Sequence, residues 1–87
     1  MRAIQPTWHC LLRFRQRVKV KRGTDAAVEA LRESLERADL TRLPPGWVAG
    51  REQSAQMWAI DDDLAYPLSP GPNGAWTAAT VLKRGSR

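Results

Sequence analysis

The sequence predicts an α+β domain in which two N-terminal helices pack on a three- or four-stranded antiparallel sheet. Apolar side chains recur at helical spacing within residues 8–18 and again within 25–39. A Pro-Pro-Gly sequence at 44–46 then ends the helical part. After it, short runs of β-prone residues alternate with turn residues. Helices followed by strands are typical of an α+β arrangement, and 87 residues suit one domain, 1–87.

The first predicted helix, residues 8–18, is amphipathic. Thr7 is the expected N-cap, because its hydroxyl can accept a hydrogen bond from the first turn. Leu11, Phe14 and Val18 fall on the face expected to be buried, with Cys10 on its flank. His9, Arg13 and Arg17 follow one another at intervals of four residues, so they line the opposite side of the helix as one stripe.

The second predicted helix covers residues 25–39 and is rich in strong helix formers. Gly23 stops the preceding segment, and Thr24-Asp25 offers an N-cap with negative charge near the helix start. Val28, Leu31, Leu35 and Ala38 form the stripe that we expect to face the core.

Four segments after Pro45 are predicted as strands: 47–50, 56–60, 64–68 and 75–83. Asp61-Asp62-Asp63 and residues 69–74 are the expected turns between them. In the third segment, alternation places Leu64, Tyr66 and Leu68 on one face, and Pro67 favours an edge or a bulge. For the last segment either face fits burial: Trp76, Thr80 and Leu82, or Thr77, Ala79 and Val81.

The charge is strongly positive and unevenly distributed. The formal net charge is +5, and residues 13–22 hold six basic side chains and no acid. Lys83 and Arg84 form a second basic group. Such surfaces attract polyanions, so we expect a nucleic acid, RNA or DNA, as the partner, while a basic surface that only aids solubility is the competing explanation.

Several classes of protein are not expected. No apolar run approaches the roughly 20 residues that cross a bilayer, so no membrane partner is predicted. The N-terminus lacks the apolar core of a secretory signal, and the chain has a single cysteine, which favours the cytoplasm. No metal-binding framework or phosphate-binding glycine loop is present, so neither a metal nor a cofactor is expected.

The order of elements, the His9–Arg13–Arg17 helix and the Thr80-Val81-Leu82-Lys83-Arg84 strand together resemble small bacterial and phage-encoded toxin domains. These domains are related to the RelE and BrnT toxins, within the barnase–colicin–RelE group of ribonuclease folds. The resemblance implies metal-independent cleavage of RNA, in which the 2′-hydroxyl attacks the neighbouring phosphate. It also implies a small acidic antitoxin-like protein as a partner.

On this resemblance each candidate residue has an expected role. His9 would transfer a proton, and Arg13 and Arg17 would hold the phosphate. Tyr66 and Thr80 would orient groups through hydrogen bonds. The nucleic-acid-binding set would be Arg15, Lys19, Lys21, Lys83 and Arg84, with Lys83 or Arg84 closing the site from the last strand. The chain holds one histidine, so a paired histidine acid and base is excluded.

The alternative is a non-catalytic binding domain with the same fold, such as a phage or mobile-element accessory protein. His9 and Arg13 would then tie the first helix to the sheet, and the basic residues would bind nucleic acid or an acidic protein. Core packing is the expected role of the tryptophans in the predicted strands, whereas one exposed beside the arginines would stack on a base. A free strand edge could also recruit a partner or a second copy of the chain.

Overall fold

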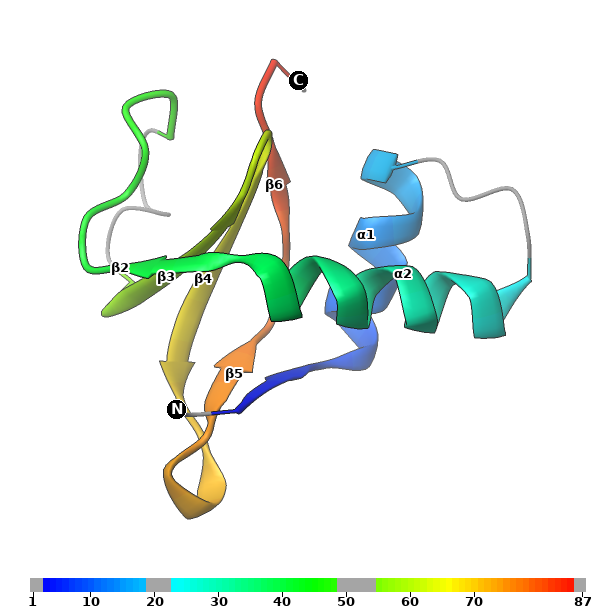
Figure 1. Ribbon diagram of the computed structural model, residues 1–87, viewed down its shortest axis with the longest axis horizontal. Helices are drawn as coiled ribbons and strands as arrows, with labels where there is room; N and C mark the ends of the chain where they lie inside the picture. The colour runs from blue at the N-terminus through cyan, green and yellow to red at the C-terminus, as the bar shows by residue number, and fades with distance from the viewer. Residues whose placement is uncertain (1–2, 19–22, 49–54, 86–87) are drawn as a thin grey trace.

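The computed structural model describes residues 3–18, 23–48 and 55–85 (Figure 1). Two α-helices lie against one face of a twisted mixed sheet, and α2 crosses in front of that sheet (Figure 1). In chain order the elements are β1 (Ile4–Pro6), α1 (Trp8–Val18), α2 (Thr24–Arg37), β2 (Asp39–Thr41), β3 (Met57–Asp61), β4 (Leu64–Pro70), the 3-10 helix η2 (Pro72–Gly74), β5 (Trp76–Ala78) and β6 (Leu82–Lys83).

Helix α1 has the predicted bounds and the predicted cap. The Thr7 hydroxyl accepts a hydrogen bond from the backbone N–H of Cys10 at 3.1 Å, which satisfies one donor of the first turn. Cys10, Leu11 and Phe14 are the buried residues of this helix. Val18, which was expected on the same face, is 39% exposed at the last position of the helix.

Helix α2 differs from its prediction at both ends and in its buried face. Gly23 is the N-cap, in an extended conformation, and Thr24 is already helical. Leu31 and Leu35 are buried and Ala38 packs against the core, as predicted, but Ala27 and Ser34 are buried in addition and Val28 is 37% exposed. The helix ends at Arg37, because Ala38 is extended and leads directly into β2. The predicted last residue, Asp39, is therefore the first residue of a strand.

The sheet is mixed, so the prediction of a purely antiparallel sheet of three or four strands was wrong. The described residues form six strands in the order β1-β5-β4-β3-β2, with β6 also paired to β4. The pair β1–β5 is parallel, with Ile4 opposite Trp76, and the other pairs are antiparallel. Strands β1 and β2 have three residues each, too few to show an alternating pattern in the sequence.

The predicted strands after Pro45 are partly confirmed. Segments 56–60 and 64–68 correspond to β3 and β4, joined by a two-residue turn at Asp62-Asp63. The segment 75–83 is two strands separated by residues 79–81. Residues 47–48 form no strand, and 49–50 lie outside the described residues. The expected loop 69–74 holds the end of β4 and the short η2.

Two apolar clusters lie on opposite faces of the sheet. Leu64, Tyr66 and Leu68 face the helices, as the alternation predicted. On the other face, Val48 packs against Trp58 and Ala65. Because residues 79–81 interrupt the last predicted strand, neither of the two faces considered for it is buried along its whole length. Trp76, Ala78 and Val81 all belong to the helix-side core, and Leu82 packs against the opposite cluster.

Candidate nucleic-acid interface

The predicted stripe of α1 lies on the surface of the molecule. His9 and Arg13 are exposed, and Arg17 is half-buried. The Nε of Arg13 donates to Nε2 of His9 at 3.5 Å, and Nη1 of Arg13 donates to Oε1 of Gln16 at 3.3 Å. Four-residue spacing places His9 and Arg13 one turn apart on the same face, which is why these side chains meet.

In this contact Nε2 of His9 is the acceptor. An imidazole beside a guanidinium combines a group that can accept a proton with a cation that fits phosphate oxygens. In the described residues neither side chain bonds to the sheet, which was the structural role considered for them.

The second predicted basic group meets the end of this stripe. Nζ of Lys83, in β6, donates to the backbone carbonyl of Arg17 at 3.3 Å. This carbonyl belongs to the last turn of α1, where the helix dipole favours a cation. Lys83 is exposed, so a positive charge 66 positions away in the sequence joins the end of the α1 stripe. Arg84 is exposed as well, but the alternation of side chains along β6 places it on the other face of the sheet, with Leu82.

The remaining basic candidates do not all share this surface. Arg15 follows Arg13 by two residues, about 200° around the helix axis, so it projects from another side of α1. Lys19 and Lys21 lie outside the described residues. Among the tryptophans, Trp8 is 64% exposed, but it lines an apolar groove beside α2.

Thr80 and Tyr66 have different environments. Thr80 is half-buried and follows Ala79, whose carbonyl accepts a hydrogen bond from the Thr7 hydroxyl at 3.3 Å. It therefore lies near the end of α1 that carries His9. Tyr66 is fully buried beneath α2, so its side chain does not reach the surface of the α1 stripe. The structure thus separates the two residues that were expected to orient groups at one site.

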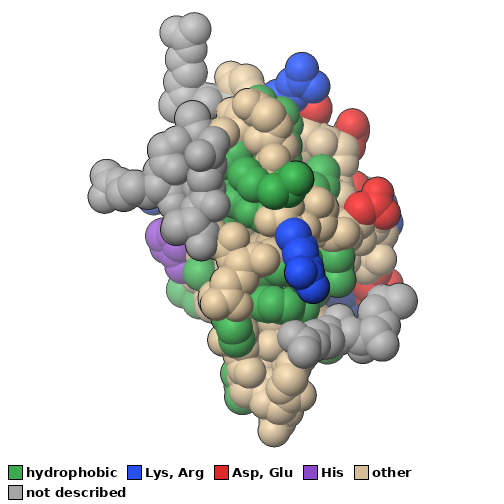
Figure 2. Space-filling view, turned by 90° about the vertical axis from the view of Figure 1, so that its left-hand side faces the viewer, with side chains coloured by type: hydrophobic (Ala, Val, Ile, Leu, Met, Phe, Trp, Pro, Cys, Tyr) green, Lys and Arg blue, Asp and Glu red, His purple; other side chains and the backbone are tan. Residues whose placement is uncertain are grey.

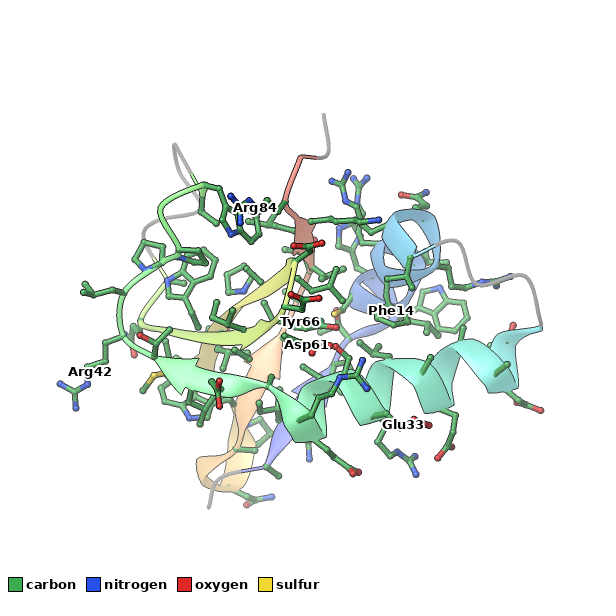
Figure 3. All side chains as sticks on the ribbon, turned by 45° about the horizontal axis from the view of Figure 1, so that its top comes forward. Phe14, Glu33, Arg42, Asp61, Tyr66 and Arg84 are labelled. Atoms are coloured by element: carbon green, nitrogen blue, oxygen red, sulfur yellow. The ribbon has the colours of Figure 1, made fainter. Side chains whose placement is uncertain are left out.

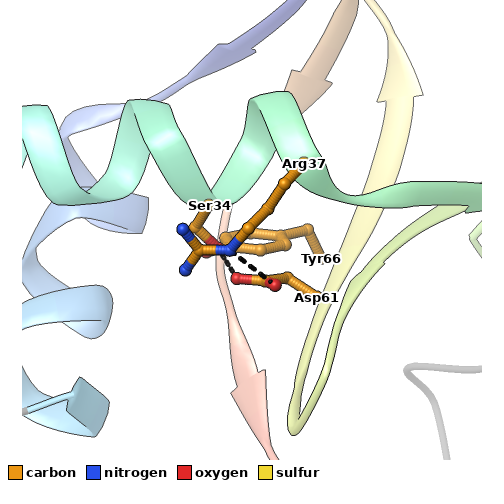
Figure 4. Close-up of polar contacts among 4 residues, drawn as sticks. All are labelled: Ser34, Arg37, Asp61 and Tyr66. Carbon is orange, nitrogen blue, oxygen red and sulfur yellow. Dashed lines mark hydrogen bonds and ion pairs between the residues drawn. The ribbon is translucent and has the colours of Figure 1, made fainter.

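Tyr66 belongs to a polar cluster that the sequence analysis missed (Figure 4). Its hydroxyl lies 2.7 Å from Oγ of Ser34, which donates to Oδ2 of Asp61 at 2.6 Å. Nε of Arg37 donates to Oδ1 of the same carboxylate at 2.9 Å. The sequence did contain one indication of this cluster: Ser34 is a polar residue among the apolar side chains on the buried face of the second helix.

The direction of these hydrogen bonds follows from the chemistry of the groups. An ionised carboxylate only accepts, so the single proton of Ser34 points to Asp61. Tyr66 must then donate to Ser34, and burial raises the pKa of Tyr66, which keeps its proton in place. Because the chain of bonds joins α2 to β3 and β4, we interpret this cluster as structural.

Within residues 3–18, 23–48 and 55–85, neither helix has the length and apolar character that crossing a bilayer requires. Among the same residues, no group of three histidine, cysteine, aspartate or glutamate side chains is placed so that it could bind a metal ion.

Comparisons with protein-family models, with curated proteins and with solved structures found no match to this chain.

Proposed function

We propose that this protein binds RNA through its phosphates, using a surface defined by His9, Arg13, Arg17 and Lys83, hereafter the basic surface. The observation that carries the proposal is the hydrogen bond from Lys83 to the Arg17 carbonyl. This contact brings the basic group of β6 to the end of the α1 stripe. A phosphodiester chain could therefore contact both elements at once.

The sign of the charge is uniform along α1. Its eleven residues include three arginines and no acid, whereas α2 has four acidic side chains. Figure 2 shows the histidine on one border of the molecule and acidic side chains gathered toward the opposite border. This separation leaves the basic surface without neighbouring acids on its own helix, which favours a polyanionic ligand.

We further propose that bound RNA is cleaved, as in the RelE-like toxins that the sequence resembles. On RNA binding the guanidinium of Arg13 would turn from Nε2 of His9 to the phosphate, which frees the lone pair of Nε2. Nε2 would then take the proton of a 2′-hydroxyl, whose oxygen would attack the adjacent phosphorus. The bond to the 5′-oxygen would break, leaving a 2′,3′-cyclic phosphate, and water would protonate the 5′-oxygen. Arg13 would stabilise the negative charge on the phosphate oxygens.

Binding is tested by fluorescence anisotropy with a labelled single-stranded RNA at several salt concentrations. We expect affinity to fall steeply with salt, with a log–log slope of roughly 0.7 per phosphate contact. Arg13→Ala and Lys83→Ala should each weaken binding, by about 1–3 kcal/mol for a lost charged contact. No binding at low salt would contradict the proposal.

Arg42→Ala is the matched control. Arg42 is an exposed arginine that follows β2, and Figure 3 shows it well away from Phe14, a residue of α1. Removal of any one positive charge should weaken RNA binding slightly. Removal of an arginine that contacts a phosphate should weaken RNA binding strongly. If Arg42→Ala and Arg13→Ala weaken binding equally, the RNA does not use the basic surface.

Cleavage is tested separately, by following the production of 2′,3′-cyclic phosphate ends from the same RNA. We expect His9→Ala to abolish cleavage while retaining the fold and most of the affinity. Binding without cleavage by the wild type would favour the non-catalytic alternative, a nucleic-acid-binding domain. A small acidic antitoxin-like partner would compete with RNA for the basic surface.

A further inference from the structure

An apolar groove of about 700 Å³ lies beside α2, and none of the residues of the basic surface lines it. One wall is α2, and the other is the segment from Ala3 to the first turn of α1, with Ala38 and Leu40 at one end. Three of the large apolar side chains that line it are strongly exposed: Trp8 at 64%, Val28 at 37% and Leu40 at 42%. An exposed apolar surface of this kind indicates a binding partner.

Two charged residues line the same groove, and they are opposite in sign. Arg32 and Glu36 lie one helical turn apart on α2, and both are exposed. Neither Arg32 nor Glu36 takes part in the ion pair of α2, which joins Arg37 to Asp61. The groove therefore presents one cation and one anion beside an apolar floor.

We propose that a second copy of this chain covers the groove, with the two α2 helices antiparallel across a twofold axis. An axis that meets the outer side of α2 at the level of position 34 places Arg32 of each copy opposite Glu36 of the other, because positions 32 and 36 are equidistant from it. The surfaces that meet across a twofold axis are identical, so each must be complementary to itself. With one cation and one anion on each surface, two ion pairs form across the axis. A strongly acidic or strongly basic partner would leave one of these charges unpaired.

The apolar residues fit the same arrangement. Along α2, Val28, Arg32 and Glu36 succeed one another every four residues, so they form one stripe beside the buried face. In the dimer, helix α2 of each copy forms one wall of the groove in its own chain. The same helix also fills the groove of the other copy. Val28 and Leu40 lie on either side of the axis, so each approaches the apolar end of the second copy. The basic surface stays outside the interface.

Sedimentation velocity at increasing protein concentration tests the proposal, with circular dichroism to verify folding. The wild type should dimerise, and the dimer should persist at salt concentrations that abolish RNA binding. Arg32→Glu and Glu36→Arg should each raise the dimer dissociation constant at least tenfold, because each creates two pairs of like charges. Combining them restores opposite charges across the axis, so the double variant should dimerise like the wild type.

Glu33→Arg is the matched control, since Glu33 is exposed on α2 but does not line the groove. It should leave dimerisation unchanged. A wild type that stays monomeric up to about 1 mM, or a double variant as monomeric as the single ones, would overturn the proposal. So would native mass spectrometry of a monomer with one small apolar molecule bound, if Val28→Asp abolished that binding.

Discussion

Ser34 is the centre of the cluster beneath α2, and its substitution gives the most exact test of the structure. Its hydroxyl donates to Asp61 at 2.6 Å and accepts from Tyr66 across 2.7 Å. Ser34→Ala removes both bonds and leaves the Tyr66 hydroxyl, which is fully buried, without a partner. The same change adds no bulk, because alanine is smaller than serine.

The expected cost is the sum of two effects. Loss of a hydrogen bond to a charged acceptor costs about 1.5–3 kcal/mol, and an unsatisfied buried hydroxyl costs about 1–3 kcal/mol. Relaxation of the side chains offsets part of this sum, so we expect a loss of roughly 2–4 kcal/mol in the free energy of unfolding. Small domains have only about 5–15 kcal/mol in total, so urea unfolding followed by circular dichroism should resolve the change clearly.

Tyr66→Phe supplies the decisive comparison. Alone it removes a donor from Ser34, whose bond to Asp61 survives, so the expected loss is about 0.5–1.5 kcal/mol. In Ser34→Ala/Tyr66→Phe no tyrosine hydroxyl is left unsatisfied. The double variant should therefore be no less stable than Ser34→Ala alone. Strictly additive losses would refute the proposed chain of hydrogen bonds.

Two further predictions concern a close approach and a buried thiol. A Cβ on Gly71 would collide with Oγ1 of Thr77 in β5, so Gly71→Ala should lower stability by about 1–3 kcal/mol in thermal unfolding, whereas Gly46→Ala, with open space around it, should change little. A loss in Gly46→Ala equal to that in Gly71→Ala would contradict the steric explanation. Burial raises the pKa of Cys10 to about 12, so the folded state keeps its proton where the unfolded thiol has lost it. Wild-type stability should consequently fall by up to about 1.4 kcal/mol per pH unit above roughly pH 8.5, and Cys10→Ala should remove this slope between pH 8.5 and 10. An unchanged slope in Cys10→Ala would show that another group is responsible.

The sequence alone determined the elements whose hydrogen bonds are local. Residues 8–18 were predicted as a helix with Thr7 as its cap, and both features are confirmed. A helix bonds to itself every four residues, so its apolar periodicity and its cap are present in one short stretch of sequence. The alternation that places Tyr66 on the helix side of β4 is equally local, and it was also right.

The structure alone decided the features that join distant segments. Strand β1 pairs with β5, some 70 residues later in the sequence. Its three residues show no alternation of apolar and polar side chains, so the sequence did not predict a strand there. The side chain of Val28 was predicted to be buried in the core and is partly exposed to solvent. The reason is that the sheet covers the side of α2 that carries Ala27 and Ser34.

The basic surface shows the same division between sequence and structure. The alignment of His9 with Arg13 follows from helical spacing and was visible in the sequence. The contact of Lys83 with Arg17 depends on where the last strand docks beside α1. Charge can be counted along a chain, but which charges become neighbours is set by the packing of its helices and strands against one another.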